Sequence, residues 1–422
     1  MTSTRTLTLA VPARAVRAIG ALLALVLAAA VAILGTTPPP AQAATLQQVA
    51  SFGSNPGGLT MFSYRPDGLP AGAPVVVQLH GCTQDAATYF ASSGWRTFAD
   101  RHGFALVLAQ QSTANNSNKC FNWFEAGDVA RGQGEAASIA SMVGHAVTAY
   151  GSDRSRVYVT GLSAGGAMTA VMLAAYPDLF AGGSINAGLP YRCATSVVAA
   201  FSCMTPGVDK SPTAWGDLVR GAYAGWSGTR PRVAIWQGQS DTTVAPLNGG
   251  ELRDQFTNVL GVSQTPTSTG SITAGVTWAD YGGKVRLTTI AGMGHGTPVD
   301  PGTAADQCGT AGAYFLDTVC AAYHDVQFFG LAGGTLPPPS TTTTTAAPTT
   351  STTSTAPTTT TTTTAPAPAC VTSSNYAHVV AGRAYQSGGY AYAVGSKQLL
   401  GLYNTFYTAT LRESSPGYWQ KC

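Results

Sequence analysis

Residues Gly161–Gly165, with the sequence Gly-Leu-Ser-Ala-Gly, have the residue types and spacing of a serine nucleophile on a sharp turn. A β-branched and aromatic run, Val157–Thr160, precedes them, and a helix-forming run, Ala167–Ala175, follows them. A strand, a tight turn and a helix in this order form a nucleophile elbow, which holds the serine hydroxyl out at the end of a sheet. We therefore expect Ser163 to be a catalytic nucleophile rather than part of a chance glycine-rich turn. The amide of Ala164 is then expected to donate to the oxyanion of the reaction.

A nucleophilic serine needs a histidine base and a carboxylate that orients the base, and two later loops offer them. In an α/β-hydrolase the acid and then the histidine follow the serine, each just after a strand. Asp241 follows an apolar run, and His295 lies between glycines after another such run. We expect Asp241 to be the orienting acid, although most aspartates in Ser-Asp-Thr sequences only stabilise a turn or a helix start. His295 is expected to be the general base, with His324 as the second choice.

A loop earlier in the chain is expected to supply the second oxyanion donor. His80 and Cys82 follow a buried run, so the Cys82 amide lies where such a donor is needed. His80 has two equally weighted interpretations: it orients this loop or contacts the oxyanion, or it is a structural histidine. A disulfide from Cys82 to Cys120 would brace the loop and bring Trp123 close to the cleft, although a single aromatic residue more often belongs to a core.

Strand-like and helix-like segments alternate between residues 44 and 334. Helical patterns lie between apolar, β-branched runs, for example at residues 135–150 and 164–175. This alternation predicts a parallel sheet covered by helices on both faces, and with the serine motif it predicts an α/β-hydrolase catalytic domain. The runs expected to be buried strands are Val75–Leu79, Ala105–Leu108, Val157–Thr160, Val233–Trp236 and Val285–Ile290.

Three further segments differ from this block in composition. Residues 1–43 combine arginines, an apolar run and Ala41-Gln42-Ala43, which indicates a secretory signal peptide cut after Ala43 rather than a retained membrane anchor. Residues 335–369 are almost entirely Thr, Pro, Ala and Ser, a composition typical of an extended linker. Residues 370–422 are rich in tyrosine and are bounded by two cysteines, so we expect a small, disulfide-closed binding domain.

Cysteine usage and charge narrow the class of function. The 8 cysteines are even in number, as expected for disulfides in an exported protein. No Cys-x-x-Cys pair occurs and the histidines are scattered, so we expect no metal and no cofactor. Without the arginines of residues 1–43, the formal charge of +3 falls to about zero, which argues against a nucleic-acid partner. Nearest-neighbour pairing predicts the disulfides Cys82–Cys120, Cys193–Cys203, Cys308–Cys320 and Cys370–Cys422.

Several motifs together resemble one known superfamily. Residues 80–84, 120–124, 161–166 and 292–295 look like those of extracellular polyhydroxyalkanoate (PHB) depolymerases and of feruloyl and acetylxylan esterases. The resemblance covers most of residues 50–330, and the order of the catalytic residues is similar to that of the type 1 PHB depolymerase domain. Residues 374–379, 381–384, 391–396 and 400–403 resemble the substrate-binding domain of short-chain-length PHB depolymerases.

The resemblance implies a secreted serine esterase that hydrolyses poly(3-hydroxybutyrate) through an acyl-enzyme. It implies His378 and Arg383 as substrate-binding residues of the C-terminal domain; His80 and Trp123 are the candidates in the catalytic domain. The expected partner is an insoluble polyester surface, with no nucleic acid, no membrane once the signal is removed, and a monomeric chain. The alternatives are a feruloyl or acetylxylan esterase whose small domain binds polysaccharide, and a non-catalytic surface adhesin.

Overall fold

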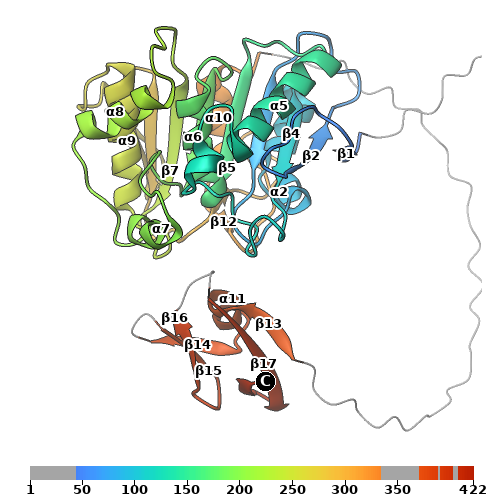
Figure 1. The fold of residues 1–422 in the computed structure, drawn as a ribbon, viewed down its shortest axis with the longest axis vertical. Helices are drawn as coiled ribbons and strands as arrows, with labels where there is room; N and C mark the ends of the chain where they lie inside the picture. The colour runs from blue at the N-terminus through green and yellow to red at the C-terminus, as the bar shows by residue number, and fades with distance from the viewer. Residues whose placement is uncertain (1–43, 334–369, 388–389, 403–406) are drawn as a thin grey trace, which may run out of the picture. The chain divides into compact units, whose positions relative to one another are not determined.

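The computed structural model describes residues 44–333, 370–387, 390–402 and 407–422, and Figure 1 shows their fold. The expected signal peptide, residues 1–43, and the expected linker, residues 335–369, lie outside the described residues. Within the described ranges, no helix has both the length and the apolar character needed to span a bilayer.

A ten-stranded sheet forms the middle of residues 44–333. In spatial order its strands are β1 (Gln47–Val49), β2 (Thr60–Tyr64), β4 (Ala105–Gln110), β3 (Val75–Leu79), β5 (Val157–Leu162), β6 (Gly182–Asn186), β7 (Arg232–Gly238), β10 (Val285–Ile290), β9 (Val276–Tyr281) and β8 (Ser268–Thr273). The strands from β4 to β10 run parallel to one another, while β2 and β9 pair antiparallel with the two ends of this parallel block. This order and these directions form an α/β-hydrolase sheet, extended at one edge by the β8–β9 hairpin.

The apolar runs of the sequence become the central strands of this sheet. All five expected strands are present, which confirms the predicted α/β-hydrolase fold. Every side chain of β3 and β5 is buried, as a parallel strand covered on both faces requires. β6 was not expected, because it begins with two glycines. A Cβ on Gly182 would lie 2.9 Å from Phe329 and one on Gly183 would lie 2.9 Å from Leu173, so helices approach both faces of β6 closely.

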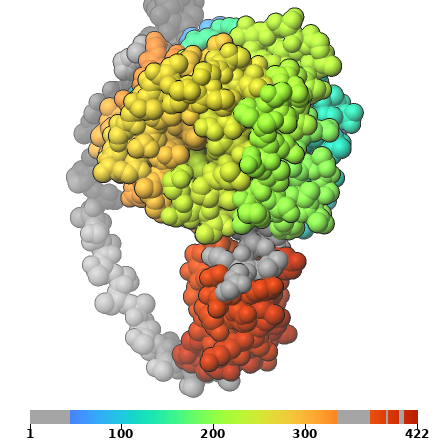
Figure 2. Space-filling model, turned by 90° about the vertical axis from the view of Figure 1, so that its left-hand side faces the viewer, coloured from blue at the N-terminus to red at the C-terminus, as the bar shows by residue number. Residues whose placement is uncertain are grey.

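Helices cover both faces of the sheet (Figure 1). The helices of residues 44–333 are α2 (Ala86–Ser92), α3 (Trp95–His102), α4 (Ala126–Val129), α5 (Gly134–Ala149), α6 (Ala164–Ala175), α7 (Val197–Met204), α8 (Pro212–Ala222), α9 (Leu247–Leu260) and α10 (Ala321–Phe329). Helices α5, α6 and α9 pack on one face, and α3 and α10 pack on the other. Figure 2 shows α8, α9 and the β8–β9 hairpin forming one continuous surface at an end of the sheet (green to yellow).

Disulfides and a short strand pair fasten the loops around the sheet. β11 (Thr297–Val299) pairs in parallel with β12 (Phe315–Asp317) outside the main sheet. The structure joins the cysteines in the pairs expected from the sequence: Cys82–Cys120, Cys193–Cys203, Cys308–Cys320 and Cys370–Cys422.

The C-terminal residues form two small antiparallel sheets around a thin core. One sheet contains β13 (Val371–Ser374), β17 (Thr408–Ser415) and β18 (Tyr418–Lys421); the other contains β14 (Ala384–Ser387), β15 (Tyr390–Ala393) and β16 (Leu399–Leu402), and helix α11 (Asn375–Val380) follows β13. The core consists mainly of alanines and two leucines: Ala384, Ala391, Ala393, Leu400, Ala409 and Leu411. A core this small gives little hydrophobic stabilisation, so the Cys370–Cys422 disulfide closes the part from end to end.

Candidate active site

Ser163 lies on the sharp turn between β5 and α6. Its backbone has a φ of 57° and a ψ of −117°, a conformation that few L-residues adopt. A Cβ on Gly161 would lie 2.3 Å from the Gly165 carbonyl oxygen, and one on Gly165 would lie 2.1 Å from the Leu79 carbonyl oxygen. Only glycine fits at both positions, so the Gly-x-Ser-x-Gly pattern follows from the close contact of the turn with β3.

The first turn of α6 follows Ser163 directly. The Ser163 amide donates to the Asn186 carbonyl (3.0 Å), which ties the turn to β6. Because Ala164 is the first residue of the helix, its N–H group has no carbonyl partner within the helix. The helix dipole adds a partial positive charge there, so the Ala164 amide suits the oxyanion role expected for it.

Asp241 and His295 meet at the ends of neighbouring strands. His295 Nδ1 lies 2.7 Å from Asp241 Oδ2, and both side chains are almost fully buried. The other carboxylate oxygen, Oδ1, accepts hydrogen bonds from the amides of Thr243 and Val244, both at 2.8 Å. An ionised carboxylate accepts all three bonds, so the Nδ1 proton of His295 points at Asp241. Nε2 is then free to take a proton from a nucleophile.

Backbone hydrogen bonds hold the acid loop against the histidine loop. The Ser240 amide donates to the Met293 carbonyl and the Gln239 amide donates to the Ile290 carbonyl, both at 2.9 Å. A Cβ on Gly238 would lie 2.4 Å from the Met293 carbonyl oxygen, so β7 must end in glycine for this approach. The acid–base geometry therefore depends on two adjacent parallel strands, β7 and β10.

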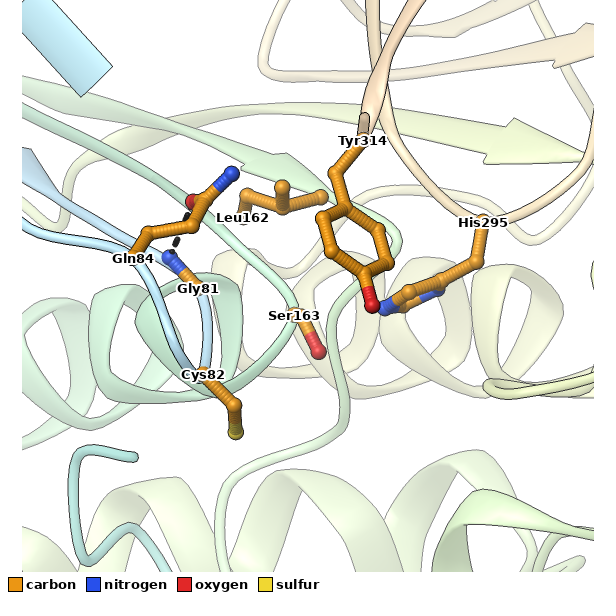
Figure 3. Close-up of a pocket in the computed structure, with 7 residues that line it drawn as sticks. All are labelled: Gly81, Cys82, Gln84, Leu162, Ser163, His295 and Tyr314. Carbon is orange, nitrogen blue, oxygen red and sulfur yellow. Dashed lines mark hydrogen bonds between the residues drawn. The ribbon is translucent and has the colours of Figure 1, made fainter. Parts of the chain in front are cut away.

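Ser163 and His295 line one small pocket, which Figure 3 shows. Its lining residues are Gly81, Cys82, Gln84, Leu162, Ser163, His295 and Tyr314. The cavity of about 10 Å³ holds little more than one water molecule, so most of a substrate must lie beyond it. His324, the second choice for the base, is not among these residues; it lies on α10 against Trp236, with ring centroids 5.9 Å apart.

His80 is buried beneath the oxyanion loop and holds the backbone of that loop. The Gln111 amide donates to His80 Nε2 (3.1 Å), so the ring proton is on Nδ1, which donates to the Gly81 carbonyl (2.8 Å). Burial lowers the pKa of His80 to about 4, which keeps the ring neutral. The C=O and N–H groups of a trans peptide point in opposite directions, so this bond turns the Cys82 N–H away from His80 and toward the pocket. The structure therefore favours the loop-orienting interpretation of His80.

A buried glutamate supports the segment behind this loop. Glu135 accepts hydrogen bonds from the side chains of Gln111 and Asn115 and from the Asn122 amide (2.8 Å). The Cys82–Cys120 disulfide joins the supported segment to the oxyanion loop. Burial raises the pKa of Glu135 to about 8. The sequence gave one signal for this role, an acidic residue within an otherwise apolar helical pattern, and it was missed.

Two aromatic residues flank the pocket, one expected and one missed. Trp123 is buried and packs against Phe124, with ring centroids 5.4 Å apart. Tyr314 lies beside His295 (Figure 3), and their ring centroids are 6.3 Å apart. Its φ of 65° is unusual for a residue with a Cβ. The Cys308–Cys320 disulfide closes the loop that carries Tyr314, and in the sequence this tyrosine is only one residue between two cysteines.

The structure places His378 and Arg383 in the framework of the C-terminal part rather than on a binding surface. His378 is fully buried, with Nε2 2.8 Å from the Ala409 carbonyl oxygen. Its Nδ1 accepts a hydrogen bond from Arg383 Nε (3.0 Å), and the Arg383 guanidinium lies over the Trp419 ring. A buried ring with both nitrogens in use has no atom left for a substrate, so the direct contact implied for His378 does not fit this structure. Arg383 acts through the same framework.

An exposed aromatic face lies on the outer side of β14, β15 and β16. Tyr385 pairs with Tyr392 across the sheet, with stacked rings 5.6 Å apart, and Tyr392 pairs with Leu399. Tyr390 is two residues from Tyr392 on the same strand, so its side chain points to the same side. We call these four residues, Tyr385, Tyr390, Tyr392 and Leu399, the aromatic face.

Comparisons with known proteins agree with this geometry. The chain matches the family model described as Esterase PHB depolymerase over residues 60–281. It is 57% identical over 294 residues to poly(3-hydroxyalkanoate) depolymerase C of Paucimonas lemoignei, covering 68% of this chain and 70% of that relative. It is 38% identical over 260 residues to feruloyl esterase B of Thermothelomyces thermophilus, covering 60% of this chain and 88% of that relative. The acetyl xylan esterase structure from Aspergillus awamori matches with a TM-score of 0.60 and 29% identity, covering 68% of this chain and all of that chain. The resemblance seen in the sequence is confirmed: the chain belongs to the Esterase PHB depolymerase family.

Proposed function

We propose that this protein is a secreted serine esterase that hydrolyses poly(3-hydroxybutyrate) to hydroxybutyrate oligomers. The observation that carries the proposal is the geometry of one pocket: Ser163 lies on a strained elbow beside His295, whose Nδ1 is held by Asp241. This arrangement is suited to acyl transfer. The family and the 57% identity to a poly(3-hydroxyalkanoate) depolymerase support a polyester as the substrate.

The proposed reaction has two half-reactions. His295 Nε2 takes the proton of Ser163 while Oγ attacks the ester carbonyl carbon, and the amides of Cys82 and Ala164 bind the resulting oxyanion. When the tetrahedral intermediate collapses, the ester C–O bond breaks and His295 returns the proton to the leaving alcohol end of the polymer. Water then attacks the acyl-enzyme with His295 as base, which releases a carboxylic acid and restores Ser163. Every step uses groups of this chain and water.

We assign the aromatic face to adsorption on the polymer. Tyr385, Tyr390 and Leu399 are among the most exposed large apolar side chains in the described residues. Tyrosine rings offer rigid, apolar contact area with a polar tip, which suits a surface of aliphatic esters. The expected linker, residues 335–369, would keep the catalytic site near the adsorbed surface at a high effective concentration.

The proposal includes export and a monomeric chain that acts on an insoluble polyester. Four disulfides in 422 residues favour an oxidising compartment, and the composition of residues 1–43 supports removal of a signal peptide. The charge of about zero after that removal suits a neutral substrate surface rather than nucleic acid.

A second candidate is hydrolysis of feruloyl or acetyl esters in plant cell walls. It is favoured by the 38% identity to a feruloyl esterase and by the match to an acetyl xylan esterase structure over that whole chain. Similarity in residues 44–333 does not separate these substrates from polyester. The aromatic face is the feature that favours polyester.

The experiment compares the full-length wild type with Ser163→Ala on a suspension of PHB granules. We expect the wild type to clear the suspension, and we expect Ser163→Ala to adsorb to granules without clearing them. Acetylated xylan and feruloylated arabinoxylan serve as the competing substrates. Clearing by Ser163→Ala would overturn the role of Ser163, and release of acetate or ferulate without PHB clearing would replace the proposal by the second candidate.

A further inference from the structure

An apolar cavity of about 140 Å³ lies between α7 and the segment that follows β4. Its walls are built from aromatic and aliphatic side chains, chiefly Trp123, Phe124, Ala200, Phe201 and Met204. Polar side chains occur on one side only, and no lining residue is charged. The catalytic steps proposed above make no use of this cavity.

The cavity adjoins the catalytic pocket on two sides. Cys120 in its wall is bonded to Cys82, which lines the catalytic pocket. On the other side the Met204 carbonyl accepts a hydrogen bond from the Ala245 amide (2.8 Å), at the end of the turn that begins at Asp241. The oxyanion loop and the acid loop therefore both border the cavity, and a polymer chain bound at the nucleophile can reach it.

The wall formed by α7 is held in place before any substrate binds. The Cys193–Cys203 disulfide anchors the helix near its C-terminal end. The Asn248 side chain donates to the carbonyl groups of Cys203 (3.0 Å) and Met204 (3.3 Å). A cavity with fixed walls selects its occupant by size, because changing its shape would break these bonds.

The size and chemistry of the cavity fit one repeat of an aliphatic polyester. A dry cavity of about 150 Å³ in another protein binds benzene, so about 140 Å³ takes a group of similar size. A hydroxybutyrate repeat has about as many non-hydrogen atoms as benzene, whereas a feruloyl group has about twice as many. Ser117 and Asn118 on the polar side offer donors for an ester carbonyl.

We propose that this cavity is a subsite for the hydroxyacyl repeat next to the scissile ester, and that its volume sets the side-chain length that the enzyme accepts. The inference rests on the proposed function and extends it, because it names the residues that read the polymer. Ala200 and Phe201, neighbours on α7, limit the space from opposite directions: enlarging Ala200 fills the cavity, and truncating Phe201 widens it.

The test uses full-length enzyme and soluble substrates: the 3-hydroxybutyrate trimer, the 3-hydroxyvalerate trimer and p-nitrophenyl acetate. For Ala200→Phe we expect the ratio of kcat/KM for the hydroxybutyrate trimer to that for p-nitrophenyl acetate to fall at least about tenfold, since acetate does not extend into the cavity. For Phe201→Ala we expect the ratio of hydroxyvalerate to hydroxybutyrate kcat/KM to rise up to about tenfold, because the extra methylene now fits. The second variant gives a gain, so it stays informative if the first does not fold.

Val198→Ser is the matched control, since Val198 is on the same helix, is 76% exposed and does not line the cavity. Both ratios should stay within about twofold of the wild type in this variant. Wild-type ratios in both cavity variants, with a wild type that cleaves the trimers, would overturn the subsite and leave the proposed function intact. A wild type that cleaves p-nitrophenyl acetate but neither trimer would overturn the proposed function, and the subsite with it.

Discussion

The two described parts of this molecule use tyrosine in opposite ways. In residues 44–333, Tyr64, Tyr89, Tyr158, Tyr176, Tyr191 and Tyr281 are each at most 7% exposed. In the C-terminal part, Tyr385 and Tyr390 are 40% and 42% exposed, while alanines fill the core. The larger part can bury its aromatic rings, and the smaller part leaves them on a flat outer face. This contrast suggests that bond cleavage and adsorption depend on separate residues, so each can be lost without the other.

The largest expected effect is on cleavage, from Asp241→Asn. An amide at this position no longer fixes the Nδ1 proton of His295 with a charge, so we expect kcat for a soluble ester to fall by about four orders of magnitude. The quantity to measure is kcat on p-nitrophenyl butyrate, beside adsorption to PHB granules. Adsorption should match that of the wild type. A kcat within about tenfold of the wild type would remove Asp241 from the mechanism.

His80→Ala should produce the next largest loss. Without the bond from His80 Nδ1 to the Gly81 carbonyl, the Cys82 amide is no longer held toward the oxyanion, so kcat should fall about 10²- to 10³-fold with little change in KM. His80→Asn should recover part of the loss, because its amide can donate to the same carbonyl. His145→Ala, which removes a histidine on α5 outside the pocket, is the control.

A purely structural role for His80 would give a different result. Both His80 variants would then lose thermal stability and KM together, and His80→Asn would give no rescue of kcat. Because the pKa of His80 is about 4, its replacement should also leave the shape of the pH–rate profile above pH 5 unchanged.

On the adsorption side of the comparison, Tyr390→Ser should weaken binding to granules by about tenfold and leave hydrolysis of a soluble ester unchanged. The change removes one ring from the aromatic face. Val380→Ser serves as the control, because Val380 is 63% exposed on α11 and lies outside that face. Equal losses of adsorption in the two variants would show that binding is not localised on the aromatic face.

The smallest expected effect is on the pH dependence of stability. Burial raises the pKa of Glu135 to about 8 and that of Asp325, which accepts a hydrogen bond from Trp236, to about 7. The folded state therefore binds protons more tightly than the unfolded state, so this contribution is complete below about pH 4 and is lost as pH rises through 7 to 8. We expect the Tm of the wild type to fall between pH 5 and pH 9.

Glu135→Gln and Asp325→Asn should each reduce this fall in Tm, because neither amide ionises. Glu125→Gln, at an exposed glutamate, should leave the slope unchanged. A wild-type slope in both buried variants would contradict the assignment. Both residues belong to residues 44–333, so adsorption through the aromatic face should not follow this titration.

The sequence was enough to predict the elbow, the acid–base pair and the strands that carry them. Gly161, Ser163 and Gly165 were predictable because sterics allow only these residue types on such a turn, whatever surrounds it. β6 was missed because Gly182 and Gly183 are there for the helices on either face, and the sequence does not show those helices packing. Single-residue conformations were equally hidden.

The surroundings of the site depended on contacts between distant segments. His80 could be placed near the oxyanion loop, but its role rests on a bond from Gln111, which is 31 residues away. Tyr314 reaches the pocket through a positive φ and a disulfide-closed loop. His378 was assigned by resemblance alone, and its burial and bonds to Ala409 and Arg383 became visible only in three dimensions.

The most direct test of the separation between cleavage and adsorption is one granule assay on the wild type, Ser163→Ala, Tyr390→Ser and the double variant. Bound protein and released hydroxybutyrate are measured in the same tube. We predict that Ser163→Ala binds like the wild type and releases no product, that Tyr390→Ser binds more weakly and releases product in proportion to what is bound, and that the double variant shows both losses. Product release by Ser163→Ala, or weakened adsorption of Ser163→Ala, would contradict the account.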